Sequence, residues 1–187
     1  MKKALLLALT LGLFSNLSAQ NFKTKKARTL TWIGKAAYGS YEPRGEIKLK
    51  SAQMNIEENT LTSLELIIDM QSLSHDNSRL EKHLKNADFF EVDKYPQARF
   101  TLKEAVSLEE QTLKLRGMLT VKDKTQFEEF EVAITQLEDE VVLQFKVNVN
   151  RIDYGVTYNS PTLFQTMKND AIDDNFQLKG RVQLFAL

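Results

Sequence analysis

Hydrophobic and polar residues alternate along much of the chain. The alternation is clearest in four sets of one parity: Leu64, Leu66, Ile68 and Met70; Leu113, Leu115, Leu119 and Val121; Leu143, Phe145, Val147 and Val149; and Phe176, Leu178, Val182 and Leu184. Neighbouring side chains of a β-strand point to opposite faces, so each set would line one face of a strand. Weaker candidates are residues 29–38, 45–57, 97–107 and 127–135. The pattern predicts about eight strands.

Short polar links join several of these strands, for example Glu57-Glu58-Asn59 and residues 108–111. Consecutive strands with such short links pair in antiparallel fashion, because parallel pairing needs a long crossover. Each strand has one apolar face, which it must bury against the others in a sandwich or a closed barrel. The sequence therefore indicates an all-β fold.

Two segments follow helical spacing instead. Residues 78–86 carry leucines four positions apart, behind an N-cap at Asn77 or Ser78. A second short helix is predicted to start at Ser160-Pro161, with an apolar face made of Leu163, Phe164 and Met167. We expect these helices to cover the ends of a barrel.

The first twenty residues are typical of a secretory signal peptide. A basic start at Lys2-Lys3 is followed by a nearly unbroken apolar run from Ala4 to Leu13 and then by small and polar residues. The run is too short for a membrane span of about 20 residues. We expect cleavage near Ala19 or Gln20, leaving residues 21–187 as one domain in the periplasm or secreted. The chain has no cysteine, so neither a disulfide nor a lipoprotein anchor is expected.

Charge and motifs point away from several classes of function. Lys+Arg and Asp+Glu balance at 25 each, which does not suit a nucleic-acid-binding protein. The two histidines, His75 and His83, are eight positions apart, which is not a helical zinc spacing, although Asp76 leaves a weak metal site conceivable. No nucleophile motif or phosphate loop is present. We therefore expect no metal, no cofactor and no catalytic activity.

One stretch is unusually aromatic for a surface turn. Residues 83–100 read HLKNADFFEVDKYPQARF and include Phe89, Phe90, Tyr95 and Phe100. This stretch resembles the YceI-like family, in which a helix ending in His-Leu precedes Asp-Phe-Phe and Lys-Tyr-Pro-x-x-x-Phe. Four further blocks are similar to the same family and occur in its order: residues 32–35, 68–73, 117–125 and 151–156.

The resemblance implies an eight-stranded antiparallel lipocalin-like barrel, usually periplasmic, that holds a polyisoprenoid or related amphiphilic lipid inside. On this interpretation the bound molecule is a lipid rather than a cofactor, for instance a quinone precursor, and the protein acts as its carrier or reservoir. Family members can dimerise, so a homodimer is a possible partner. No membrane-spanning segment is expected.

Candidate ligand-binding residues are the aromatic side chains and one arginine: Trp32, Phe89, Phe90, Tyr95, Phe100, Phe145, Arg151 and Phe164. Two interpretations of the rings stay open, because a small barrel can hold one slim ligand or be filled by its own side chains. Arg151 continues the inward parity of Val149, so it would either anchor an anionic head group or pair with Asp76, Asp88 or Asp153. A self-filled barrel would instead suit a stress-related structural or interaction protein.

Overall fold

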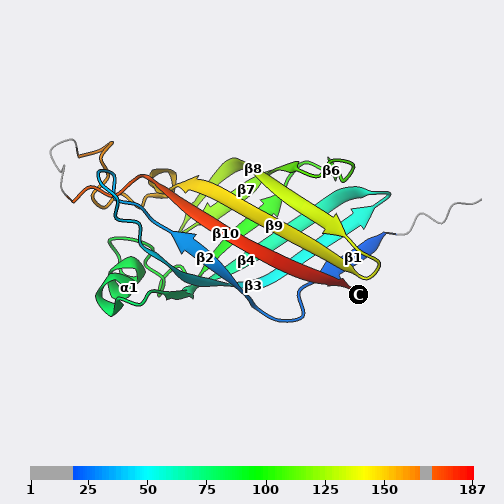
Figure 1. Ribbon diagram of the computed structural model, residues 1–187, viewed down its shortest axis with the longest axis horizontal. Helices are drawn as coiled ribbons and strands as arrows, with labels where there is room; N and C mark the ends of the chain where they lie inside the picture. Colours follow the sequence, from blue (N-terminus) through cyan, green and yellow to red (C-terminus); the bar gives the residue numbers. More distant parts are fainter. Residues whose placement is uncertain (1–18, 165–169) are drawn as a thin grey trace, which may run out of the picture.

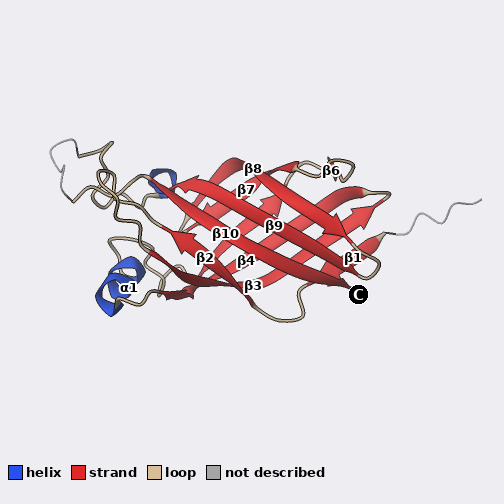
Figure 2. Ribbon diagram, viewed as in Figure 1, coloured by secondary structure: helices blue, strands red, loops and turns tan. Residues whose placement is uncertain are grey.

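The computed structural model describes residues 19–164 and 170–187, and their fold is a β-barrel with one short helix at one end (Figures 1 and 2). The strands are β1 (Gln20–Lys23), β2 (Arg28–Ile33), β3 (Arg44–Glu57), β4 (Thr60–Ser74), β5 (Gln97–Leu102), β6 (Val106–Ser107), β7 (Leu113–Val121), β8 (Lys124–Gln136), β9 (Glu140–Asn150) and β10 (Asn175–Ala186). A helix, α1 (Ser78–Lys85), follows β4, and a 3-10 turn, η1 (Arg151–Tyr154), follows β9.

The ten strand segments form eight barrel strands, because two barrel strands are each divided into two segments. β1 pairs with β3 and β10, which are also the neighbours of β2, so β1 and β2 are two parts of one strand. β5 and β6 likewise both pair with β4. Every pairing is antiparallel, and the β2–β10 pair closes the sheet on itself. Closure leaves no long open edge.

The predicted fold class, an all-β antiparallel eight-stranded barrel, is confirmed. Two predicted strands were too long. The stretch 29–38 ends its strand at Ile33, and beyond it only Ala36 forms an isolated bridge, to Ile172. The stretch 97–107 is interrupted at residues 103–105. The strand β1 and the turn η1 were not predicted, since four residues each give too little pattern.

The predicted helix at residues 78–86 is confirmed as α1. Asn77 is its N-cap, and the side chain of Asn77 accepts hydrogen bonds from the backbone N–H groups of Arg79 and Leu80. The second predicted helix is not seen in the described part of its segment, where residues 161–163 form turns, and Met167 lies outside the described residues. Figure 1 shows α1 and the segment before β10 at the same end of the barrel, opposite β1 and the C-terminus. The predicted signal peptide lies outside the described residues, apart from Ala19 and Gln20.

The β3–β4 hairpin is fixed by its two-residue turn. Glu58 and Asn59 have φ of 45° and 60°. Two successive positive φ values are typical of the type I′ turn, whose twist matches that of paired strands.

Among the described residues, no helix is long and apolar enough to cross a membrane.

The indole of Trp32 lies against the neighbouring strand β3 at Gly45. The two residues are cross-strand partners in the β2–β3 pair, and Trp32 Nε1 donates to the Ser74 carbonyl at 3.1 Å. A Cβ at position 45 would lie 2.0 Å from the Ser74 oxygen and 2.7 Å from the indole. Glycine in a strand commonly marks such a close approach. Gly45 therefore fixes the position of the indole.

Replacing Gly45 with alanine is expected to destabilise the barrel by about 2 kcal/mol or more, because backbone and indole must both shift. Gly34→Ala is the matched control, since its Cβ would meet its nearest neighbour, Pro43, at 3.6 Å. Urea unfolding followed by circular dichroism measures both variants. Equal stability of the two variants would contradict this role of Gly45.

Candidate functional site

A cavity of about 520 Å³ occupies the half of the barrel nearest α1. Seven of the barrel strands contribute to its wall, and β8 does not. The apolar strand side chains that line it are Trp32, Ile47, Ile68, Met70, Leu73, Ala98, Leu119, Val121, Val149, Phe176 and Leu178. Asn175, the first residue of β10, is the one polar residue of the described strands that lines it. The volume falls within the range of about 300–1,000 Å³ of small-molecule sites.

Three segments cover this end of the barrel: α1 with the residues after it, the β2–β3 loop, and the described residues between η1 and β10 (Figure 1). An aromatic cluster joins the first of these segments to the third and to β10. His83 makes edge-on contacts with Phe89 and Tyr158, with ring centroids 5.0 and 4.7 Å apart. Phe90 makes a similar contact with Phe176 at 6.0 Å. His83, Phe89, Phe90 and Tyr158 therefore form an aromatic part of the cover over the cavity, which we call its roof.

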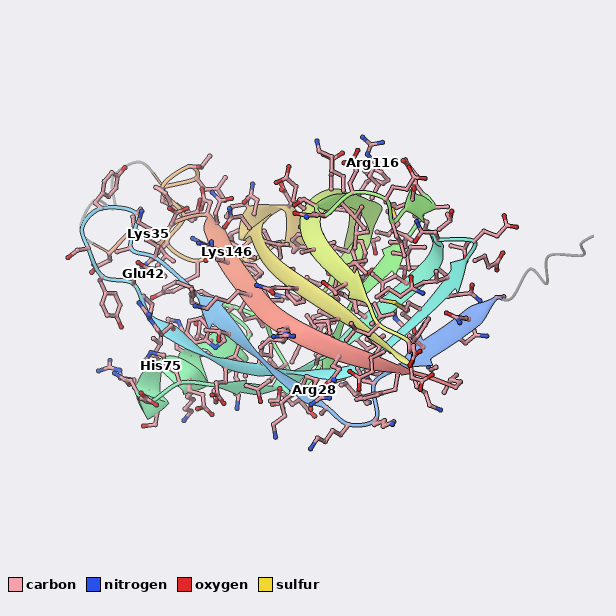
Figure 3. All side chains as sticks on the ribbon, turned by 45° about the vertical axis from the view of Figure 1, so that its right-hand side comes forward. Arg28, Lys35, Glu42, His75, Arg116 and Lys146 are labelled. Atoms are coloured by element: carbon pink, nitrogen blue, oxygen red, sulfur yellow. The ribbon has the colours of Figure 1, made fainter. Side chains whose placement is uncertain are left out.

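The cavity reaches solvent beside the β2–β3 loop. Lys35, Tyr41 and Asp170 line it and are exposed, with 62% of Tyr41 accessible. Figure 3 shows Lys35 and Glu42 on this loop at the end of the barrel. Asn159 and Asp173 also line the cavity, so its mouth mixes positive, negative and uncharged polar groups.

Four of the eight predicted site residues line the cavity: Trp32, Phe89, Phe90 and Arg151. Phe89 is 4% exposed, and its carbonyl accepts from Lys122 Nζ at 3.1 Å. This bond ties the stretch after α1 to the β7–β8 turn. Phe89 and Phe90 therefore serve both as roof of the cavity and as packing for the helix.

The other four predicted residues do not line the cavity. Tyr95 donates its hydroxyl to Asp123 at 3.2 Å on the outside of the barrel. Phe100 and Phe145 are buried deeper along their strands, and Phe100 packs against Phe130 with centroids 5.7 Å apart. Phe164 is 48% exposed at the surface. A role in ligand contact stays a prediction for all eight residues.

Arg151 is held by the protein itself. Its side chain is 3% exposed and donates to the carbonyls of Val156, Ile172 and Asp173 at 2.7, 2.8 and 3.0 Å, and to Asp174 Oδ1 at 3.4 Å. Burial lowers the pKa of the guanidinium, and Asp174 and Asp173 oppose that shift. These bonds use four of its five N–H groups. Arg151 therefore fastens the segment before β10 to η1, and its ion-pair partner is Asp174 rather than Asp76, Asp88 or Asp153.

Several cavity residues were missed as candidates. Met70, Leu119 and Phe176 were assigned to strand faces but not to a binding site, because parity shows the face and not the height along the barrel axis. Tyr158 lies in a turn with no periodic signal, and Lys35 was placed in the predicted strand 29–38, which ends at Ile33. Tyr158 becomes part of the roof only through tertiary contacts with His83 and Phe89.

His75 and Tyr154 do not line the cavity, and each is bonded within the protein. His75 Nδ1 accepts from the Asn77 backbone N–H at 2.8 Å, and its ring lies 5.6 Å from the Trp32 ring. Within residues 19–164 and 170–187, no three His, Cys, Asp or Glu side chains gather closely enough to hold a metal ion. Tyr154 donates to Glu128 at 2.6 Å, and burial, then that bond, raises the pKa of its phenol.

Replacing Arg151 with methionine is expected to destabilise the protein by roughly 3–5 kcal/mol, because Asp174 and three carbonyls lose their buried partner. Arg116→Met is the control: Arg116 is exposed on the barrel wall (Figure 3), where it pairs with Glu129 and Glu104, and exposed pairs stabilise little. Thermal unfolding measures both. A stable Arg151→Met variant with weakened lipid binding would instead indicate an anionic-ligand anchor.

Solved structures share this fold at low sequence identity. The Burkholderia cenocepacia protein BcnA superposes with a TM-score of 0.68 at 17% identity, over 84% of this chain and 95% of that chain. A polyisoprenoid binding domain from Saccharophagus degradans, implicated in plant cell wall breakdown, gives 0.63 at 12% identity, over 91% and 99%. The Campylobacter jejuni YceI protein gives 0.55 at 17% identity, over 98% and 97%.

Among curated proteins, none matches the sequence. The YceI-like domain, however, matches residues 21–184, which include all of the barrel strands except the first residue of β1 and the last two of β10. This chain therefore belongs to the YceI-like family.

Proposed function

We propose that this protein binds an isoprenoid or similar amphiphilic lipid in its barrel and acts as a carrier or reservoir without catalysis. The observation that carries the proposal is the cavity of about 520 Å³, whose strand-derived wall is apolar except for Asn175 at the start of β10. A barrel filled by its own side chains would leave no such space. The relative from Saccharophagus degradans, described as a polyisoprenoid binding domain, supports the same ligand class.

The size of the cavity suits a short lipid tail. A methylene group takes about the space of a liquid water molecule, ~30 Å³, so 520 Å³ accommodates about 17 such groups. At about 0.8 kcal/mol for each methylene, burying them yields roughly 14 kcal/mol before the costs of association. Those costs are at least several kcal/mol, and micromolar affinity needs about 8 net. A tail of this length supports micromolar binding if the mouth adds a few polar contacts.

The polar groups at the mouth favour a head group without net charge. Lys35 is accompanied there by the carboxylates of Asp170 and Asp173, and the donors of Arg151 are already occupied. A diphosphate would therefore meet as much negative as positive charge. A hydroxyl or carbonyl head can instead bond to donors such as Asn159 or Asn175.

Binding can be followed directly, because the only tryptophan of the chain, Trp32, lines the cavity. Titration with farnesol, a 15-carbon isoprenoid alcohol, is expected to change its fluorescence with a saturable, micromolar profile. Ala98→Phe should weaken binding at least about tenfold, since the added ring takes the space of several buried chain carbons.

Ala133→Phe is the matched control, because Ala133 is exposed on β8, away from the cavity wall. It should bind farnesol like the unaltered protein. No saturable signal with the unaltered protein, or equal binding by both variants, would refute lipid binding in this cavity.

We also propose export with cleavage near Ala19 or Gln20. The basic start and apolar run of the first twenty residues support it. β1 begins at Gln20, so cleavage at either position leaves the barrel nearly complete. N-terminal sequencing of protein from the cells that make it should then give Gln20 or Asn21 as the first residue. A mature protein that starts at Met1 would contradict export by this route.

A further inference from the structure

The inner end of the cavity can be located on five strands. On each of them the last lining residue is followed, two positions further into the barrel on the same face, by a residue that no longer lines the cavity. The successive inward pairs are Trp32 and Leu30, Ile47 and Leu49, Ala98 and Phe100, Leu119 and Gly117, and Leu178 and Gly180. These pairs mark where the cavity wall gives way to the buried interior of the barrel.

Two buried phenylalanines, Phe100 and Phe145, lie inward of these wall residues, and the ring of each lies close to a glycine; we call these two rings the floor. A Cβ at Gly117 would lie 2.6 Å from Phe100 Cζ, and one at Gly180 would lie closest to Leu30 and 3.2 Å from Phe145 Cζ. Gly180 is also the cross-strand partner of Phe145. The glycines leave the room that the rings need to extend across the interior.

The barrel beyond the floor is filled by its own side chains. Leu115, Leu143, Val182 and Leu184 are each 2% exposed or less, and so is Phe22 from β1. These residues belong to the same buried cluster as Phe100 and Phe145. A chain that enters at the mouth can therefore advance only as far as the two rings.

We infer that Phe100 and Phe145 set the length of the chain that the cavity accepts, at about three isoprene units. This inference rests on the proposed lipid binding and adds a specificity to it. The cavity accommodates about 17 methylene-sized groups, and three isoprene units contain 15 carbons. A fourth unit remains outside the mouth, in water, where it adds little to binding.

The test is a series of isoprenoid alcohols of increasing length, namely geraniol, farnesol and geranylgeraniol, titrated by Trp32 fluorescence. For the unaltered protein, affinity should rise at least about tenfold from 10 to 15 carbons and change less than about threefold from 15 to 20. Phe100→Ala and Phe145→Ala each remove six ring carbons, slightly more than the five carbons of an isoprene unit. In these variants the increase should continue to 20 carbons.

A variant that works in the opposite direction covers the case in which the alanine variants do not fold. Leu178 lines the cavity directly above the floor, so Leu178→Phe fills open space without crowding the core. It should move the limit to shorter chains, so that farnesol binds no better than geraniol. Phe22→Ala is the control, because it deletes the same ring from the filled half and should leave the length profile unchanged.

The outcomes separate this inference from the proposed function. If the unaltered protein binds none of the alcohols, lipid binding itself fails. Binding that strengthens steadily through 20 carbons overturns the floor. An unchanged limit in Leu178→Phe, or a shift in Phe22→Ala equal to that in the floor variants, also overturns it.

Discussion

The interior of an eight-stranded barrel is only wide enough for side chains from facing strands to meet across it. A large inward side chain therefore fills the interior at its level, and a small one leaves space there. In this chain the smaller residues Ala98, Val121 and Val149 line the cavity, whereas the large residues Phe100 and Phe145 are buried outside it, and we infer that they close its inner end. The position of the cavity and the length of the molecule that it can hold both follow from this distribution of side-chain size.

The strands and their inward faces could be predicted from the sequence because parity depends only on neighbouring residues. The height of each residue along the barrel could not, since it depends on the register between strands far apart in the chain. Phe100 and Trp32 illustrate the difference: both are buried in the barrel, but only Trp32 lines the cavity. The same limit explains why Phe145 was grouped with the ligand candidates.

Arg151 shows a second limit of sequence-based interpretation. Its inward position followed from the parity of β9, but three of its four partners belong to the segment 172–174, which lies 21 to 23 positions further along the chain. Carbonyl groups of such a segment carry no sequence signal. The arginine therefore had two open interpretations, and the hydrogen bonds favour the structural one. With Arg151 occupied, an apolar tail and a neutral head suit the site better than an anionic head.

The most direct measurement is native mass spectrometry of the protein purified from the cells that make it, followed by organic extraction of what it carries. Lipid binding in the barrel predicts a co-purifying apolar molecule built of isoprene units or of a comparable short chain, released only when the protein unfolds. A clean ligand-free mass, from protein that also fails to take up added isoprenoid, would contradict the proposal. The barrel would then be better explained as a structural or interaction module.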